Sequence, residues 1–289
     1  IASDGYYMIG LTQKKQSFFI GLRSTFYRLA MVTGQGLLVI FAGFLENQYG
    51  DNTKAWSITM ISAAVLMAAL TISNFFTAPK FEEPASESKE KPAGFIEVFT
   101  TFFKKHQIGV ALMFVLTYRL GESQLVKMAS PFLLDELEVG GLAYSTEAVG
   151  TIYGTVGIIM LSLGGILGGI LISRDGLKKW MLPMLLALNL PNALYAILAI
   201  TQTTSIYAVV GTVILEQFGY GFGFAAFMMY LIYVAEGASK TSHYAIATGF
   251  MALGMMLPGM LSGYIQEWLG YDGFFIWVVI AALPAFLVL

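Results

Sequence analysis

The chain has 289 residues, of which 57% are hydrophobic and only 12% are charged, and its formal net charge is −2. A soluble domain carries about 25% charged residues, so this composition cannot cover a water-facing surface and indicates a protein of the lipid bilayer. The chain has no cysteine, which excludes disulfides, thiolate metal sites and cysteine nucleophiles. The near-neutral charge and the scattered basic residues give no indication of a nucleic-acid partner.

Eight apolar stretches are each long enough to cross a membrane as a helix, which needs about 20 residues. Helices are favoured because open strands in lipid would leave backbone groups without hydrogen bonds. The sequence therefore predicts an all-α, polytopic membrane helix bundle with about eight transmembrane helices. The stretches are residues 18–44, 55–77, 107–134, 147–173, 180–200, 205–235, 244–266 and 273–289.

The loops between these stretches form two sets that differ in the number of cations. The cations of one set of loops are Lys14, Lys15, Lys80, Lys89, Lys91, Lys104, Lys105, Arg174, Lys178, Lys179 and Lys240, eleven in all. The other set contains only Lys54 as a cation, together with acidic residues such as Asp135 and Glu138. Because cationic loops stay on the cytoplasmic side, both ends of the chain are predicted to be cytoplasmic.

One connection differs from the others in composition. Residues 78–94 are rich in Pro, Glu, Ser and Lys, which predicts a flexible linker, and residues 95–105 place apolar side chains at helical spacing, which predicts an interfacial amphipathic helix. We therefore expect four parts, and four further helices of a two-bundle transporter before residue 1. The parts are a cytoplasmic loop at 1–17, the last two helices of an N-terminal bundle at 18–77, the linker with its helix at 78–106, and a six-helix C-terminal bundle at 107–289.

Glycine is concentrated in three of the stretches. The run 164–169 contains two overlapping pairs of glycines four residues apart, and such pairs let helix backbones approach closely in membranes. The sixth stretch contains further glycines at Gly219, Gly221 and Gly223, and the seventh stretch contains others. We expect close helix packing at these positions.

Ionisable side chains inside the stretches are the main indication of function. At the bilayer centre each costs about 2.5–3.5 kcal/mol, so we expect them to face a bundle interior or a water-filled cavity. Three of them, Arg28, Arg119 and Glu216, lie about 16–18 Å from the end of their helix, near the midplane where transporters place substrate and ion sites. The full set is Arg23, Arg28, Arg119, Glu122, Lys127 and Glu216.

Helical geometry restricts which of these groups can meet. Arg119 and Glu122 are about 60° apart on one face, so the spacing predicts an ion pair, either as part of a site or as a buried pair that fixes helix register. Arg23 and Arg28 are about 140° apart, and Arg23 is expected to reach toward the interface. Glu216 is a candidate proton carrier, with pairing to an arginine of another helix as the alternative.

Other polar side chains at depth provide hydrogen bonds, either to a substrate or between helices. They are Gln35, Gln124, Gln217, Asn189, Asn192, Tyr27, Tyr118 and Tyr220. The two histidines, His106 and His243, have no ligand-spaced partner, so no metal site is predicted. The glycines at 219–223 lie inside an apolar run and do not form a nucleotide loop. No cofactor and no enzymatic activity are predicted.

Two sets of residues resemble a known family. The turn from Gly169 through Arg174, Asp175 and Gly176 to Lys178-Lys179 is similar to the loop signature of the major facilitator superfamily, with the acid and arginine reversed. A closer resemblance is to the AmpG-type muropeptide permeases, in family order over nearly the whole chain. It is carried by residues 27–36, Tyr118-Arg119-Leu120-Gly121-Glu122, Leu215-Glu216-Gln217 with Ala225-Ala226-Phe227, residues 259–268, and the opening at residues 2–7.

This resemblance implies a monomeric permease of the bacterial inner membrane that imports anhydromuropeptides with protons, in peptidoglycan recycling and β-lactamase induction. The rival hypotheses are a same-family carrier of another anion such as acetyl-CoA, and a membrane receptor or scaffold that transports nothing. Arg28, Tyr118, Arg119, Gln124, Lys127, Gln217 and Tyr220 are the expected substrate-binding residues. Glu122 and Glu216 are expected in proton coupling, and Asp4, Arg23, Arg174 and Asp175 in gating or structure.

Overall fold

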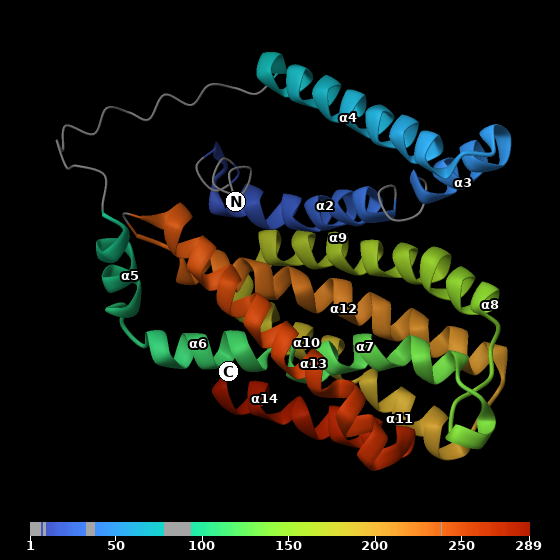
Figure 1. The fold of residues 1–289 in the computed structure, drawn as a ribbon. Helices are drawn as coiled ribbons and strands as arrows, with labels where there is room; N and C mark the ends of the chain where they lie inside the picture. Colours follow the sequence, from blue (N-terminus) through green and yellow to red (C-terminus); the bar gives the residue numbers. More distant parts are fainter. Residues whose placement is uncertain (1–6, 8–9, 33–37, 78–93, 238) are drawn as a thin grey trace. The chain divides into compact units, whose positions relative to one another are not determined.

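The computed structural model describes residues 7, 10–32, 38–77, 94–237 and 239–289 (Figure 1). These residues form helices and connections, with no strand among them, which confirms the predicted all-α class. The chain divides into two compact units, one of Ile1–Ser24 with Pro92–Leu289 and the other of Thr25–Lys91. The second boundary falls inside the linker predicted at 78–106, of which residues 78–93 lie outside the described set.

The smaller unit contains the second half of α2 (Gln13–Val32), α3 (Leu38–Tyr49) and α4 (Asn52–Thr77). Helix α4 packs on α3, but most of its side chains are exposed, with Phe75 and Phe76 the most exposed at 75% and 79%. An apolar helix of 26 residues with so little burial is stable only where lipid covers it.

The larger unit contains the first half of α2 and all helices from α5 onward. The helices are α5 (Phe95–Phe103), α6 (Ile108–Thr117), α7 (Leu120–Leu134), the 3-10 turn η2 (Leu137–Val139), α8 (Thr146–Thr151), the π-helix η3 (Ile152–Gly157), α9 (Ile158–Asp175), α10 (Leu177–Asn189), α11 (Asn192–Thr201), α12 (Ile206–Val234), α13 (Lys240–Ala281) and α14 (Leu283–Val288). Inside this unit α12 packs against α9 and α10, and α13 packs against α7 and α11 (Figure 1).

Five helices of the described residues are long and apolar enough to cross a membrane. They are Asn52–Thr77, Thr146–Asp175, Leu177–Thr201, Ile206–Val234 and Lys240–Val288.

This number is smaller than the eight predicted stretches for identifiable reasons. The 49-residue helix Lys240–Val288 covers the last two stretches, which are separated by a kink at Gly270, where φ is 70°. The third stretch, predicted as one continuous helix, is broken between α6 and α7, so neither piece is long enough by itself. The first stretch includes residues 33–37, which lie outside the described set.

Glycine allows the backbones of α9 and α12 to touch. A Cβ atom at Gly164 would lie 2.1 Å from the carbonyl oxygen of Phe218, and one at Gly221 would lie 2.0 Å from that of Leu161. No real Cβ atom approaches a carbonyl oxygen so closely, so only glycine fits at these positions. The close packing predicted from the glycines of the fourth and sixth stretches is therefore present in the structure. In the seventh stretch a Cβ atom at Gly249 or Gly263 would have nothing within 4 Å, so the prediction does not hold at those two positions.

Gly219 and Gly211, both on α12, provide a matched test of this packing. A Cβ atom at Gly219 would lie 1.9 Å from the Ala187 carbonyl oxygen, whereas one at Gly211 would have nothing within 4 Å. We expect Gly219→Ala to lower the free energy of unfolding by about 1–3 kcal/mol, because α10 must move away. Gly211→Ala should leave it unchanged or raise it by up to about 1 kcal/mol, because alanine has the higher helix propensity and its Cβ meets no neighbour. Thermal unfolding of the purified variants in detergent measures both, and equal effects would contradict the packing argument.

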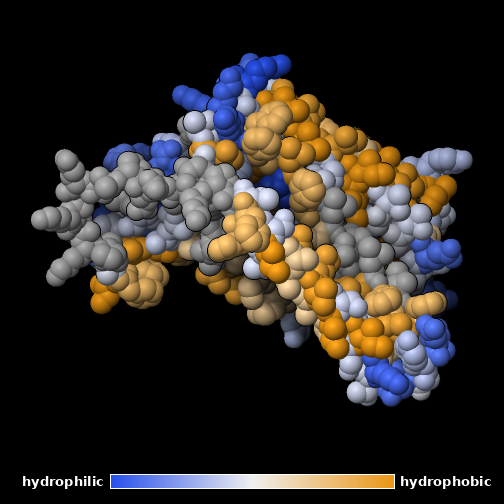
Figure 2. Space-filling view, turned by 90° about the horizontal axis from the view of Figure 1, so that it is seen from above, coloured by the Kyte–Doolittle hydropathy of each residue, from blue (hydrophilic) through white to orange (hydrophobic). Residues whose placement is uncertain are grey.

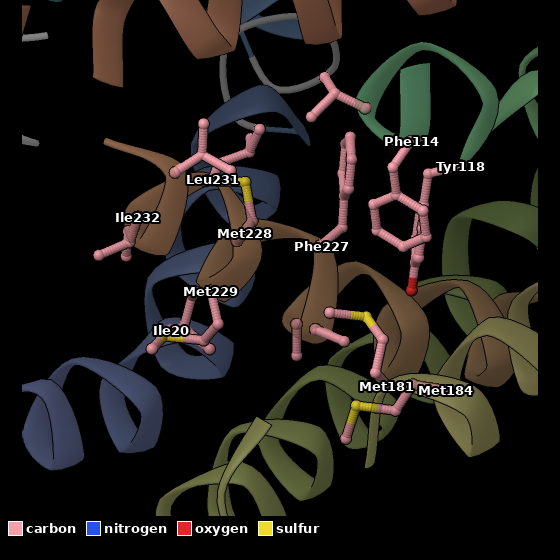
Figure 3. Close-up of a cluster of buried hydrophobic side chains, with 14 of the residues drawn as sticks. Ile20, Phe114, Tyr118, Met181, Met184, Phe227, Met228, Met229, Leu231 and Ile232 are labelled. Carbon is pink, nitrogen blue, oxygen red and sulfur yellow. The ribbon is translucent and has the colours of Figure 1, made fainter. Parts of the chain in front are cut away.

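Aliphatic, aromatic and methionine side chains together form a buried cluster inside the larger unit (Figure 3). The ring of Tyr118 stacks on that of Phe227, with centroids 4.6 Å apart and an interplanar angle of 3°. Its hydroxyl donates a hydrogen bond to the Gly223 carbonyl oxygen at 2.9 Å. Tyr118 therefore joins α6 to α12 through both its apolar ring and its polar tip.

Large apolar side chains are exposed on the surface as well (Figure 2). In the larger unit Tyr207, Trp268 and Leu287 are 87%, 84% and 87% exposed. Exposed apolar surface on this scale is unfavourable in water and is expected where acyl chains are the solvent.

Helix α5 lies within residues 95–105, where the sequence predicts an interfacial amphipathic helix. Phe102 is fully buried, with its ring centroid 5.5 Å from that of His243 on α13, whereas Phe95 and Ile96 are each 78% exposed. Just after the helix, the Nζ atom of Lys105 donates to the carbonyl oxygens of Val234 and Glu236 at 2.5 and 2.7 Å. These contacts attach α5 to the end of α12 and the start of α13.

Candidate functional site

A buried ion pair lies where the third predicted helix is broken. Arg119 has non-helical backbone angles of φ −113° and ψ 18°, and α7 begins with the next residue. Its Nε atom donates to Oε2 of Glu122 at 2.8 Å, and the side chains are 4% and 1% exposed. The structure thus contains the predicted pair, but at the start of a helix rather than inside one.

Two further helices hold the guanidinium group of Arg119. Its terminal nitrogens donate to the hydroxyl of Tyr220 on α12 at 2.7 Å and to the sulfur of Met255 on α13 at 2.8 Å. The charge also lies over the rings of Tyr220 and Phe224, at 5.0 and 5.2 Å from their centroids, a favourable arrangement for a desolvated cation. One arginine thereby joins α7, α12 and α13.

Glu122 is less completely satisfied than its partner. Its Oε1 atom is buried and accepts no hydrogen bond within the described part of the chain. A buried carboxylate oxygen without a donor is costly, and a water, a proton or a ligand hydroxyl at this position would remove the cost.

A second buried carboxylate belongs to a residue on the same helix as Tyr220. Glu216 precedes Tyr220 by four residues on α12, which is about 6 Å along the axis and nearly the same face. It is 2% exposed, and the side-chain amide of Gln217 donates to both of its oxygens at 3.1 and 2.9 Å. Tyr195 of α11 also interacts with it electrostatically. The ion pair and this carboxylate are therefore neighbouring parts of one polar region.

The other predicted site residues on α7 have different surroundings. Gln124 is buried, and both ends of its amide are used: Oε1 accepts from the Trp277 indole at 2.9 Å and Nε2 donates to the Leu120 carbonyl at 3.0 Å. Lys127 is exposed, and its aliphatic stem passes over Gly259 of α13. Both side chains contact α13 rather than the Arg119 cluster.

The residues predicted for gating or structure lie apart from this region or outside the described set. Arg174 donates to Asp175 through two nitrogens, and Asp175 also accepts from the indole of Trp180 at 2.9 Å. Arg23 lies over the ring of Tyr7, 5.4 Å from its centroid. Asp4, Gln35 and the side chain of Arg28 lie outside the described residues, so the predicted meeting of Arg28 with Arg119 and Glu216 remains a prediction.

The sequence analysis did not identify four contributors to the polar region. Met255 and Phe224 touch the guanidinium group, but they are common residue types in such helices. Tyr195 and Tyr153, whose hydroxyl oxygens are 2.5 Å apart, could have been found, because each is a lone phenol in an apolar or glycine-rich stretch.

The described residues of the larger unit bury this region almost completely. Arg119, Glu122 and Glu216 are each at most 4% exposed, so a ligand could reach them only after the helices move apart. A cation, two carboxylates and three tyrosine hydroxyls beside a broken helix are suited to binding an anion and exchanging a proton. No catalytic nucleophile is among them.

Comparison with known proteins assigns the family. Residues 5–238 match the Major Facilitator Superfamily. The chain belongs to this superfamily. The anhydromuropeptide permease of Escherichia coli K12 is 24% identical over 264 residues, which are 91% of this chain and 50% of that protein. The transporter AmpG 4 of Rickettsia felis is 26% identical over an alignment of 296 positions, which covers all of this chain and 67% of that protein.

These relatives confirm the predicted resemblance to AmpG-type permeases of the major facilitator superfamily. The chain spans about half the length of the Escherichia coli permease that it matches. Membership of a transporter superfamily, permease-named relatives and long apolar helices together indicate a multi-pass membrane transporter and not an enzyme.

Proposed function

We propose that the protein imports anhydromuropeptides together with protons across the bacterial inner membrane. In this proposal the chain supplies about eight transmembrane helices, two before the linker and six after it, with both ends in the cytoplasm. The name of the Escherichia coli relative supports the substrate. The eleven cations in one set of loops, against one in the other, support the orientation.

The observation that carries the proposal is the Arg119 cluster at the start of α7. A muropeptide presents carboxylates and sugar hydroxyls, and a guanidinium group beside Tyr220 can bind both kinds of group. In the closed arrangement the carboxylate of Glu122 is paired with the guanidinium group of Arg119. A substrate carboxylate would replace Glu122 when the helices open, and Glu122 would then be free to accept a proton.

Proton coupling in this proposal uses Glu122 and Glu216. Both are buried, and they lie on α7 and α12, which Arg119 and Tyr220 connect. A carboxylate at this depth is costly when ionised unless it is paired, so protonation and substrate binding can favour the same conformation. Alternating access would follow from rocking of the two bundles about this region.

Uptake into vesicles tests the proposal. Membrane vesicles containing the full-length protein should accumulate radiolabelled anhydromuropeptide when an inward proton gradient is imposed, and a protonophore should abolish the accumulation. Vesicles from cells without the protein are the control. Accumulation of labelled acetyl-CoA in place of the muropeptide would overturn the substrate assignment. No gradient-driven accumulation of either compound would favour the scaffold hypothesis and overturn the transporter proposal.

A further inference from the structure

Three polar side chains from three helices form a row inside the larger unit. The hydroxyl of Tyr153 on η3 lies 2.5 Å from the hydroxyl of Tyr195 on α11, and either oxygen can be the donor. Tyr195 in turn lies beside the carboxylate of Glu216 on α12 and interacts with it electrostatically. The row contains two neutral hydroxyls that can each accept one proton while donating another.

The row leads from the acidic end of the unit toward its middle. The acidic end consists of the loops at residues 135–145 and 202–205, which are joined by hydrogen bonds from Gln202 to Gly140 and from Tyr144 to Thr204. Distances along the helix axes follow from the rise per residue. Tyr153 lies about 10 Å from the start of α8, and Tyr195 lies about 9 Å from the end of α11. Glu216 lies about 15 Å from the start of α12. The two phenols are thus nearer that end than the carboxylate.

The outer residue of the row is more exposed than the two inner residues. Tyr153 is partly exposed, Tyr195 is fully buried, and Glu216 is 2% exposed. Tyr153 also lies in a π-helical segment, where the backbone departs from the regular α-helix, and such segments are frequent at functional sites. The side chain of Gln217 lies beside the last residue of this segment, Gly157.

A second observation indicates room for water beside the row. Asn192, one turn before Tyr195 on α11, is fully buried, and neither its Oδ1 nor its Nδ2 has a hydrogen-bond partner among the described residues. Buried amides without protein partners are the usual positions of internal water, which makes about three hydrogen bonds. A water at Asn192 would extend the polar row within the protein.

We infer that Tyr153 and Tyr195 form a proton relay between the acidic end and Glu216, an inference that rests on the proposed proton coupling. A hydronium ion gives a proton to the Tyr153 oxygen and becomes water, as the phenolic proton of Tyr153 passes to the Tyr195 oxygen. The phenolic proton of Tyr195 passes to the ionised carboxylate of Glu216. Both phenols end neutral and the carboxylate ends as the carboxylic acid, so one proton has moved and no bond other than O–H bonds has changed.

The groups that face Glu216 on its described neighbours are compatible with this role. They are the phenols of Tyr195 and Tyr153 and the amide of Gln217, and one turn further along α12 is Tyr220, which binds Arg119. Protonation of Glu216 would therefore change the charge beside the Arg119 cluster. This arrangement gives the proton and the proposed substrate anion adjacent positions on one helix.

Infrared spectroscopy on the purified full-length protein, without substrate, tests the relay directly. A pH-difference spectrum should contain a carboxylic C=O band that Glu216→Gln removes. Tyr195→Phe should shift this band to higher frequency, because the acid loses a hydrogen-bond partner. Tyr271→Phe is the matched control: Tyr271 is also buried near the acidic end, but its hydroxyl donates to Asp135. A band that Tyr195→Phe leaves in place would overturn the inference.

A transport measurement gives the second readout. In proteoliposomes, Tyr195→Phe and Tyr153→Phe should each lower gradient-driven accumulation of labelled anhydromuropeptide about tenfold or more. Each should leave counterflow, which needs no net proton movement, within about twofold of the unchanged protein. Equal accumulation by Tyr195→Phe and Tyr271→Phe would overturn the relay. If the unchanged protein accumulates no muropeptide but the infrared band shifts as expected, the substrate proposal fails and the relay is retained.

Discussion

Replacement of Arg119 by methionine is expected to lower the free energy of unfolding by about 3–5 kcal/mol, because it leaves the buried Glu122 carboxylate without its cation. The effect should be largely reversed in the double variant Arg119→Met, Glu122→Met. Two apolar side chains of similar volume carry no desolvation cost, and replacing a whole buried pair in this way is often neutral or stabilising. Thermal unfolding of the single and double variants in detergent measures both effects.

The same two variants separate a structural role of the pair from a role in binding. If Arg119 binds the substrate anion, the double variant should be stably folded but should show no counterflow of labelled anhydromuropeptide. Ser123→Ala is the matched control on α7, since the Ser123 hydroxyl donates to the Leu120 carbonyl rather than to the Arg119 cluster. Normal counterflow in the double variant would show that the pair only fixes the packing of α7.

The class of fold could be predicted from composition and the length of apolar stretches, because only helices satisfy their own backbone in lipid. Hydropathy could not predict where the third of those helices breaks. The interruption before α7 lies at two ordinary residues, Tyr118 and Arg119, whose side chains contact α12. The kink at Gly270, by contrast, lies between the predicted stretches 244–266 and 273–289, because Gln266, Glu267 and Asp272 interrupt the apolar run there.

The candidate site was partly predictable for a related reason. Charges at membrane depth are rare, so Arg119, Glu122 and Glu216 could be found by residue type alone, and their i,i+3 spacing was enough to predict the pair. Tyrosine is common in such helices, and its role depends on what its hydroxyl reaches. That Tyr153 and Tyr195 meet follows from the packing of η3 against α11, and no spacing within either helix contains this information.

Glu216→Gln is expected to abolish gradient-driven accumulation of anhydromuropeptide, with a loss of at least about a hundredfold. Glutamine has nearly the same shape as protonated glutamic acid, so the variant resembles the proton-loaded state permanently. Exchange of labelled for unlabelled substrate can proceed in that state, and counterflow should stay within about threefold of the unchanged protein. Accumulation and counterflow in proteoliposomes, measured on the same preparation, give the two values.

Glu147→Gln is the control for this experiment, because Glu147 lies in the first turn of α8 at the acidic end and is exposed. Glu147→Gln also removes one negative charge, but it does not alter the row of Tyr153, Tyr195 and Glu216. Both accumulation and counterflow should therefore be unchanged. Glu122→Gln should behave differently from both, since it leaves Arg119 without its carboxylate and is expected to alter substrate affinity in counterflow as well. Loss of counterflow together with accumulation in Glu216→Gln would place Glu216 in substrate binding, because a residue that only carries the proton is not required for exchange.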